Sequence, residues 1–302
     1  MPILPARGLR RFSASSLSVL AILALTFAGI SCPAIAQDRL VTMRSAYPPQ
    51  LDEGFHELYE LRFDDARAKF SDFESSHPAD PVGEAAQAAS YVYEEFYRKG
   101  VFTSAYFLDD RKFLGGIPDA PDKPLCDKFL QLDAQARSKA QQVLKSSPTD
   151  VNGLLALTLA DGMMADYNEV IAKKEFASLR SMRQAEADAA RLLAVDPGAA
   201  DADVAIGAAN YVLGSLPAYK RVFLWFGGIH GDKVRGMTQL QQAALHAHYL
   251  KPLAEVLLAL ASLREHQPAE ARNLFLQLSR DFPQNPVFAR ELATAQKMSA
   301  GN

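Results

Sequence analysis

Four times along the chain, an alanine is followed by apolar residues four and seven positions later and by a proline twelve positions later. On a helix these apolar positions share one face, and the proline ends the helix because it has no N–H and clashes with the preceding turn. The copies are Ala66-Phe70-Phe73-Pro78, Ala136-Ala140-Val143-Pro148, Ala185-Ala189-Leu192-Pro197 and Ala271-Phe275-Leu278-Pro283. This pattern predicts one helical unit that ends in the same way each time.

Spacing alone does not identify the unit, because it also fits residues 21–33, 36–48 and 205–217. At the four copies, however, the proline opens a short polar turn and a new helical pattern follows, as in His77-Pro78-Ala79-Asp80. A degenerate fifth copy, Gly236-Leu240-Ala243, lacks the proline.

The clearest unit spans Lys251 to Pro286, where two helical patterns meet at His266-Gln267-Pro268. It resembles a tetratricopeptide repeat, a helix-turn-helix unit of about 34 residues that stacks into a solenoid. Strand-like alternation is nearly absent, so we expect an all-α fold: an irregular α-α superhelix of tetratricopeptide-like hairpins over residues 51–300. The alternative is an all-α bundle of proline-broken helices without a true solenoid.

The first 36 residues have the features of an export signal. Three arginines precede an apolar run from Leu17 to Ile30, and Ala34-Ile35-Ala36 provides a small-residue cleavage site. We expect cleavage after Ala36, a leader over residues 37–50, and a periplasmic or secreted protein. An uncleaved anchor and lipid attachment at Cys32 are the alternatives, and nothing later in the chain is both long and uncharged enough to span a membrane.

Charge and cysteine content exclude two classes of protein. Removing three arginines and no acid leaves 29 basic and 35 acidic residues (32 − 3 against 35), a net charge of −6. Such a surface does not suit nucleic acid. Cys126 would be the only remaining cysteine, so no internal disulfide is possible, and we interpret it as an apolar filler rather than a reactive thiol.

Several segments depart from the regular pattern. We expect one helix over residues 101–113, the longest irregular stretch over 114–124, and one long helix, or two with a slight break, over 168–194. The irregular stretch, with Gly115 and Gly116, is either a binding rim or a tolerated insertion.

The segment from Ala205 to Leu240 is the most individual part of the chain. Its Ser215-Leu216-Pro217 turn, apolar helix and Gly231-Asp232 turn resemble a divergent tetratricopeptide-like family that includes eukaryotic mitochondrial outer-membrane proteins. The whole chain more closely resembles exported tetratricopeptide-like proteins of bacteria, which implies a scaffold without activity. For residues 222–229, which hold the single tryptophan, we favour burial in the repeat core over a lipid-touching patch or the floor of a cleft.

No motif predicts a catalytic residue, a metal site or a cofactor. Residues 227–233 are glycine-rich, but they lack the phosphate-loop spacing and a preceding strand, so an interhelix turn with Asp232 as N-cap is favoured. His246 and His248, two apart on an expected helix, would point in different directions and could not share a metal ion.

These observations favour a non-enzymatic exported scaffold that binds a protein or peptide partner. A small-ligand domain with a pocket under the Gly115-Gly116 loop is second, and an enzyme is third. If the first helices of successive hairpins line one concave face, Tyr59, Tyr93, Tyr97 and Tyr167 are candidate binding residues, since tyrosine suits interfaces. The alternative is that these rings simply pack against neighbouring helices.

Overall fold

The computed structural model describes residues 47–117, 119–226 and 228–300, which contain fourteen α-helices, one π-helical turn and no strand. The expected signal segment and most of the leader lie outside these residues. The elements are α2 (Pro49–Tyr59), α3 (Phe63–Ser76), α4 (Val82–Lys99), α5 (Ser104–Phe107), α6 (Asp110–Gly115), α7 (Lys123–Ser146), α8 (Val151–Asp166), the π-helical turn η1 (Tyr167–Ile171), α9 (Glu175–Val195), α10 (Ala202–Ser215), α11 (Ala218–Phe226), α12 (Lys233–His246), α13 (Lys251–Arg264), α14 (Pro268–Asp281) and α15 (Pro286–Ala300).

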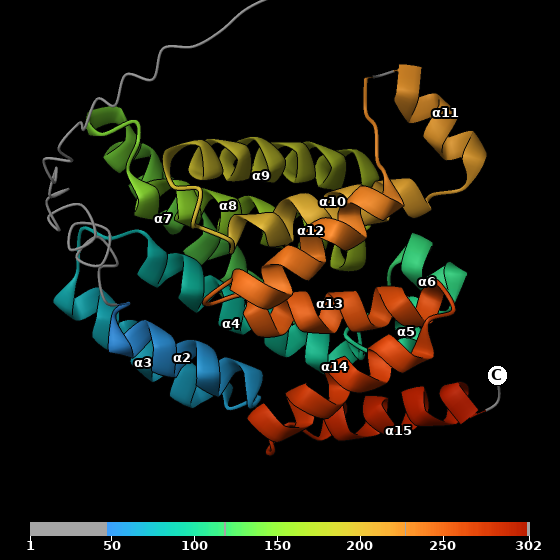
Figure 1. The fold of residues 1–302 in the computed structure, drawn as a ribbon. Coiled ribbons are helices and arrows are strands. Elements are labelled where there is room, and N and C mark those ends of the chain that lie inside the picture. The colour runs from blue at the N-terminus through green and yellow to red at the C-terminus, as the bar shows by residue number, and fades with distance from the viewer. Residues whose placement is uncertain (1–46, 118, 227, 301–302) are drawn as a thin grey trace, which may run out of the picture. The chain divides into compact units, whose positions relative to one another are not determined.

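The helices pack as five successive hairpins and a final helix (Figure 1). The pairs are α2/α3, α4/α7, α8/α9, α10/α12 and α13/α14, and α15 packs on α14. Two hairpins carry insertions between their helices: α5 and α6 in the second, and α11 in the fourth. The expected irregular all-α superhelix of tetratricopeptide-like hairpins is confirmed.

The alanine and apolar positions of the repeat form the seams between paired helices. Every member is at most 2% exposed except Val143, which is half-buried. The fully enclosed set comprises Ala66, Phe70, Phe73, Ala136, Ala140, Ala185, Ala189, Leu192, Ala271, Phe275 and Leu278. Small residues let the helix backbones approach, and the large ones fill the space beside them.

The four prolines end their helices with one shared geometry. The residue before each proline has φ between −134° and −130° and ψ between 59° and 95°. Proline forces its predecessor out of the helical region, so each helix stops two residues before Pro78, Pro148, Pro197 or Pro283. In the turns after Pro78, Pro148 and Pro283, a side-chain oxygen of Asp80, Asp150 or Asn285 accepts a hydrogen bond from an N–H at the start of the next helix.

The first helices of the hairpins lie next to one another in the order α2, α4, α8, α10 and α13. They do not present the open concave face that the sequence led us to expect. In α8 and α13 most residues are buried, 11 of 16 and 9 of 14 respectively. The reason is that residues near the two ends of the described array are bonded to each other, so the inner layer becomes a core.

Several bonds make this connection. Tyr59 Oη donates to the carbonyl of Tyr249 at 3.2 Å, and Asn285 Nδ2 donates to the carbonyl of Tyr59 at 2.8 Å. The N–H of Gln284 donates to a Glu60 carboxylate oxygen, also at 2.8 Å. The first hairpin is therefore held by the segments that precede α13 and follow α14.

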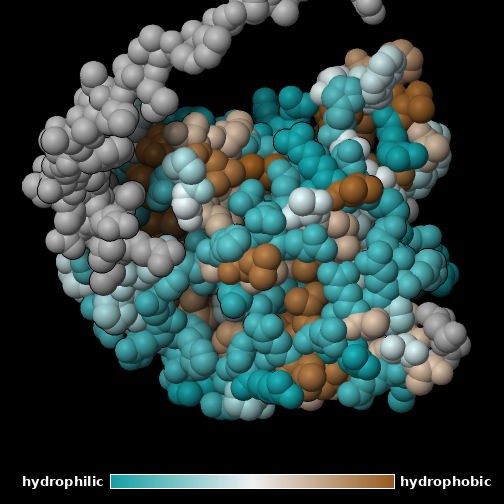
Figure 2. All heavy atoms as spheres, in the orientation of Figure 1, coloured by the Kyte–Doolittle hydropathy of each residue, from teal (hydrophilic) through white to brown (hydrophobic). Residues whose placement is uncertain are grey.

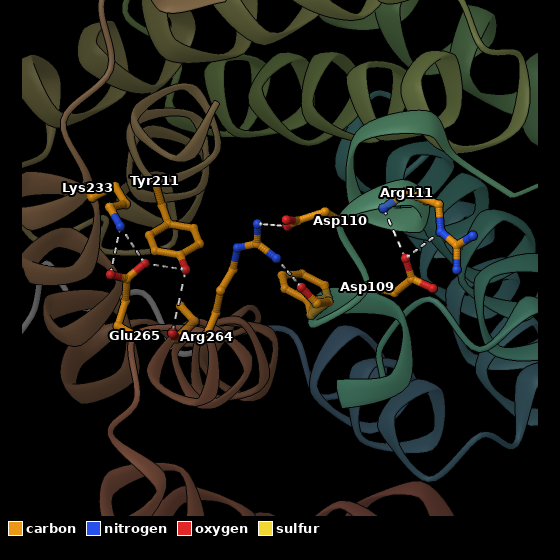
Figure 3. A network of polar contacts seen from close by, with 9 residues as sticks. Asp109, Asp110, Arg111, Tyr211, Lys233, Arg264 and Glu265 are labelled. Carbon is orange, nitrogen blue, oxygen red and sulfur yellow. Dashed lines mark hydrogen bonds and ion pairs between the residues drawn. The ribbon is translucent and has the colours of Figure 1, made fainter. Parts of the chain in front are cut away.

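The α5–α6 insertion is fixed by a second network at the end of α13 (Figure 3). Arg264 donates to the carbonyl of Phe107 at 2.6 Å, forms an ion pair with Asp110 and lies 4.4 Å from the Phe113 ring centroid. Its neighbour Glu265 accepts from Lys233 Nζ and, at 3.2 Å, from Tyr211 Oη.

Other expectations about local structure need correction. Residues 101–113 form two short helices rather than one, since Asp109 begins a new helix by accepting from the N–H of Arg111. For residues 168–194, the expected alternative with a break is the one found, because η1 ends at Ile171 and α9 begins at Glu175. His248 lies beyond α12, so it does not share a helix with His246, and its ring bonds to Asp52 at 2.6 Å.

Candidate binding pocket

Three of the four candidate tyrosines come together in the structure. Tyr59 ends α2, and Tyr93 and Tyr97 lie one turn apart on α4; all three line the same pocket. Tyr167 does not, because it begins η1 and packs on Phe129, with ring centroids 5.2 Å apart.

The pocket, called here the tyrosine pocket, has a volume of about 60 Å³ and lies where α2, α4, α13 and α15 meet. Its lining residues are Leu58, Tyr59, Leu61, Phe63, Tyr93, Tyr97, Gly100, Phe102, Thr103, Leu253, Val256, Asn285, Val287, Phe288 and Arg290. The bond from Asn285 to the carbonyl of Tyr59 holds the start of α15 at the end of α2.

The three rings have different roles. Tyr59 is buried and bonded to Tyr249, so it belongs to the framework. Tyr93 is half-buried and meets Phe102 edge-on, with centroids 5.5 Å apart. Tyr97 is 38% exposed and is therefore the ring most accessible to a partner.

The charges around the pocket are sparse. Burial raises the pKa of Tyr59 and of Tyr93, and the neighbouring Asp166 raises that of Tyr93 further, so both hydroxyls stay protonated at neutral pH. Arg290 is the single charged residue in the lining, and its side chain is 62% exposed. The tyrosine pocket therefore has an apolar floor, with tyrosine hydroxyls and the Arg290 guanidinium as hydrogen-bond donors at its edge.

A second cavity of about 100 Å³ shares Tyr93 and Leu253 with the tyrosine pocket and lies between α4, α8, α10 and α13. Its only charged lining residue is Asp166. Asp166 itself is exposed. Sequence reasoning missed both Asp166 and Arg290, because a single charged residue on a helix carries no signal of a cavity; α8 contains a second acid, Asp161, that pairs with Arg137 instead.

Helix α11 contradicts the expectation of burial. None of its residues is buried, and Trp225 is 60% exposed. The helix is an insertion between α10 and α12 and stands out from the hairpins around it (Figure 1), and no element in the described part of the chain covers its outer side. A cavity of about 440 Å³ separates it from α9 and α10.

The Gly115-Gly116 loop is packed on η1. A Cβ at Gly116 would lie 2.8 Å from the carbonyl of Val170, and the N–H of Ile117 donates to the same oxygen at 3.1 Å. Gly116 also has φ of +67°, which favours glycine. The base of this loop is therefore a contact between hairpins.

Other residues that the sequence singled out have structural roles. Asp232 is the N-cap of α12 and accepts from the N–H of Arg235 at 3.1 Å, as expected. Cys126 is buried, which raises the pKa of its thiol to about 11. Within the described ranges, no three His, Cys, Asp or Glu side chains gather in a way that could hold a metal ion. Nor does any helix of those ranges combine the length and apolarity that crossing a membrane requires.

No family model matches the chain, and neither does any curated protein. Among solved structures it is similar to a thermophilic TPR protein of Thermus thermophilus, with 15% sequence identity and a TM-score of 0.43. That similarity covers 78% of this chain and 91% of the other.

Proposed function

We propose that this chain is a non-enzymatic helical-repeat protein that binds a peptide segment of a protein partner at the tyrosine pocket. The observation that carries the proposal is the convergence of Tyr59, Tyr93 and Tyr97 on one apolar pocket where distant parts of the array meet. Tyrosine and arginine are the residue types that contribute most to binding at interfaces, and Arg290 lies at the edge of this pocket.

The size of the pocket favours a peptide side chain as its occupant. Pockets for drug-sized molecules hold about 300–1,000 Å³. The tyrosine pocket holds about 60 Å³, which suits one short apolar side chain. The ligand we propose inserts such a side chain beside Tyr97 and places a backbone carbonyl or a carboxylate near Arg290.

A small-ligand function is the second candidate, and one observation favours it. The cavity between α9, α10 and α11 holds about 440 Å³, and its lining is mainly apolar, with Glu169, Glu175, Ser178 and Lys220 as polar groups. This volume lies in the range of small-molecule pockets. It is a different place from the Gly115-Gly116 loop suggested by the sequence.

We also propose that the protein acts after export. The support is the sequence of residues 1–36 alone, and the expected mature N-terminus is Gln37. N-terminal sequencing of protein recovered from the cell envelope tests this. An intact Met1, or a lipid on Cys32, would contradict it.

Selection from a displayed peptide library tests the binding proposal. Peptides enriched on the wild-type protein should bind Tyr97→Ala and Tyr93→Ala at least about tenfold more weakly, as expected for interface anchors. Tyr91→Ala is the matched control, because Tyr91 lies on the same helix but packs under Arg67, whose Cζ lies 3.9 Å from the centroid of the Tyr91 ring. Equal binding by all three variants, or no enrichment at all, would contradict the proposal.

A further inference from the structure

The exposed side of α11 carries an unusual concentration of apolar side chains. Of thirteen exposed large hydrophobic residues in the part of the chain that the structure describes, seven lie on α11, at the start of α9 or at the start of α12. They are Phe176, Tyr219, Val222, Phe223, Trp225, Phe226 and Val234. Figure 2 shows brown, hydrophobic atoms over this helix. Exposed apolar side chains gathered on one helix mark an interaction surface.

The apolar residues of α11 follow the period of a helix. Tyr219, Val222, Phe223 and Phe226 occupy positions i, i+3, i+4 and i+7, so they form one face. These side chains are 72%, 56%, 69% and 78% exposed, respectively. The apolar face of α11 is therefore exposed, and two of its residues, Tyr219 and Phe223, also line the cavity between α11, α9 and α10.

The basic residues of α11 form bonds with the neighbouring segments. Lys220 Nζ bonds to Glu175 of α9 at 3.2 Å, and Arg221 donates to the carbonyl of Gly214 at 3.4 Å. Arg183 of α9 reaches the end of the insertion and donates to the carbonyl of Gly228 at 3.2 Å. Basic groups thus flank the apolar face, as in helices that lie in a membrane interface.

The charge of this region is opposite to that of the whole protein. Residues 214–236 contain Lys220, Arg221, Lys233 and Arg235 against Asp232, a net charge of +3 (4 − 1), whereas the chain carries −3. Lys220 and Lys233 form ion pairs with Glu175 and Glu265, so Arg221 and Arg235 are the basic side chains that give this surface its positive charge. A positive, aromatic surface on an acidic protein is complementary to anionic lipid headgroups. Tryptophan and tyrosine also prefer the boundary between headgroups and acyl chains.

We propose that α11, with Phe176 of α9 beside the same cavity, docks the protein on an anionic lipid bilayer, where the helix lies in the plane of the interface. Nine residues of helix extend about 14 Å, which is too short to span a bilayer of about 30 Å. Binding is therefore peripheral and reversible. The inference concerns a different surface from the tyrosine pocket and does not depend on the peptide proposal.

Trp225 makes the test direct, because it is the only tryptophan in the chain. Protein purified from the cell envelope, with its N-terminus determined, is titrated with vesicles of phosphatidylcholine alone or mixed with phosphatidylglycerol. With the anionic vesicles the Trp225 emission should move to shorter wavelength and be quenched by brominated acyl chains. The partition constant should fall with added salt and be lower on phosphatidylcholine alone.

Variants with the same N-terminus separate the contribution of α11 from that of any other segment. Phe223→Ser with Phe226→Ser should lower the partition constant at least about tenfold, because each ring loses its burial in the interface. Arg221→Gln should lower it about fivefold on anionic vesicles only. Leu245→Ser is the matched control, since Leu245 is 67% exposed on α12 outside the patch, and it should bind as wild type.

Two results would overturn the proposal. The first is equal vesicle binding by wild type and the Phe223→Ser/Phe226→Ser variant, or no quenching by brominated lipid. The second is an emission shift that occurs without lipid, grows with protein concentration and vanishes in the double variant, because a second copy of the chain would then cover the face.

Discussion

The phenol hydroxyl of Tyr59 donates a hydrogen bond of 3.2 Å to the backbone carbonyl of Tyr249, although 190 positions separate the two residues. The carbonyl of Tyr59 in turn accepts from Asn285. Each repeat of an open solenoid contacts only its neighbours, so its ends can fray independently. Here the first hairpin is bonded to segments near the other end of the described array, and we expect the hairpins to unfold together.

Removing the Tyr59 hydroxyl should destabilise the protein. Tyr59→Phe keeps the ring and leaves the carbonyl of Tyr249 without this donor, so the free energy of unfolding should fall by about 1 kcal/mol. Urea denaturation measures the change, and Tyr91→Phe, whose ring keeps its contact with Arg67, serves as control. Identical midpoints for the two variants would show that the Tyr59 bond contributes nothing.

Enlarging the small position of the last hairpin should force α13 and α14 apart. Ala271 is fully buried, and Ala271→Leu should lower the free energy of unfolding by about 1–3 kcal/mol through overpacking. Ala293→Leu on α15 is the control, because Ala293 is exposed, whereas Ala295, two positions later, is fully buried. Equal melting temperatures would mean that the seam tolerates the added volume.

A glycine should stabilise the turn between the helices of the last hairpin. His266 has φ of +60° and is exposed, and a left-handed conformation costs a non-glycine residue about 1–2 kcal/mol. His266→Gly relieves this strain but makes the unfolded chain more flexible, so we expect a net gain of up to about 1 kcal/mol. Arg272→Gly, in the exposed interior of α14, should instead lose roughly 0.5–1 kcal/mol. A loss at His266 as large as that at Arg272 would refute the turn geometry.

The stability of the protein should fall as pH rises through the range in which Glu255 ionises. Burial raises the pKa of this carboxyl to about 7, while the unfolded chain has a pKa near 4.3. The folded state therefore binds the proton more tightly. The stabilising contribution is fully present below about pH 4 and is lost as pH rises to about 7.

Glu255→Gln should reduce this slope. The glutamine keeps an acceptor for Gln277 Nε2, which lies 3.0 Å from Glu255 Oε1, and it removes the buried charge. Above neutral pH the variant should be more stable than the wild type, as measured by urea denaturation at a series of pH values. A slope equal to that of the wild type would show that Glu255 does not contribute.

The repeat could be predicted from sequence because its signal is local. Proline restricts the residue before it, and the period of the helix places Ala271, Phe275 and Leu278 on one face whatever their neighbours. Helix ends were therefore predicted within about two residues at all four prolines. The bond between Tyr59 and Tyr249 was not predicted, because it depends on the cumulative curvature of several hairpins.

The environment of Trp225 was predicted wrongly for a related reason. The sequence pattern of an apolar helix is the same whether the helix packs in a core or lies outside one, and only the tertiary arrangement decides between the two. The expected layer of first helices accounts for the gathering of Tyr59, Tyr93 and Tyr97. The open groove that we also expected along this layer does not form. The bonds between distant hairpins reduce that groove to separate cavities of about 60 and 100 Å³.

Nuclear magnetic resonance of the tyrosine rings tests the proposed peptide site most directly. The chain contains ten tyrosines, and carbon-13 labelling with single Tyr→Phe variants assigns their signals. On titration with a library-selected peptide, we expect the Tyr93 and Tyr97 signals to shift in saturable fashion, while Tyr91 and Tyr219 stay unchanged. Saturable binding that shifts Tyr219 or Tyr167 and leaves Tyr93 and Tyr97 unmoved would contradict the account.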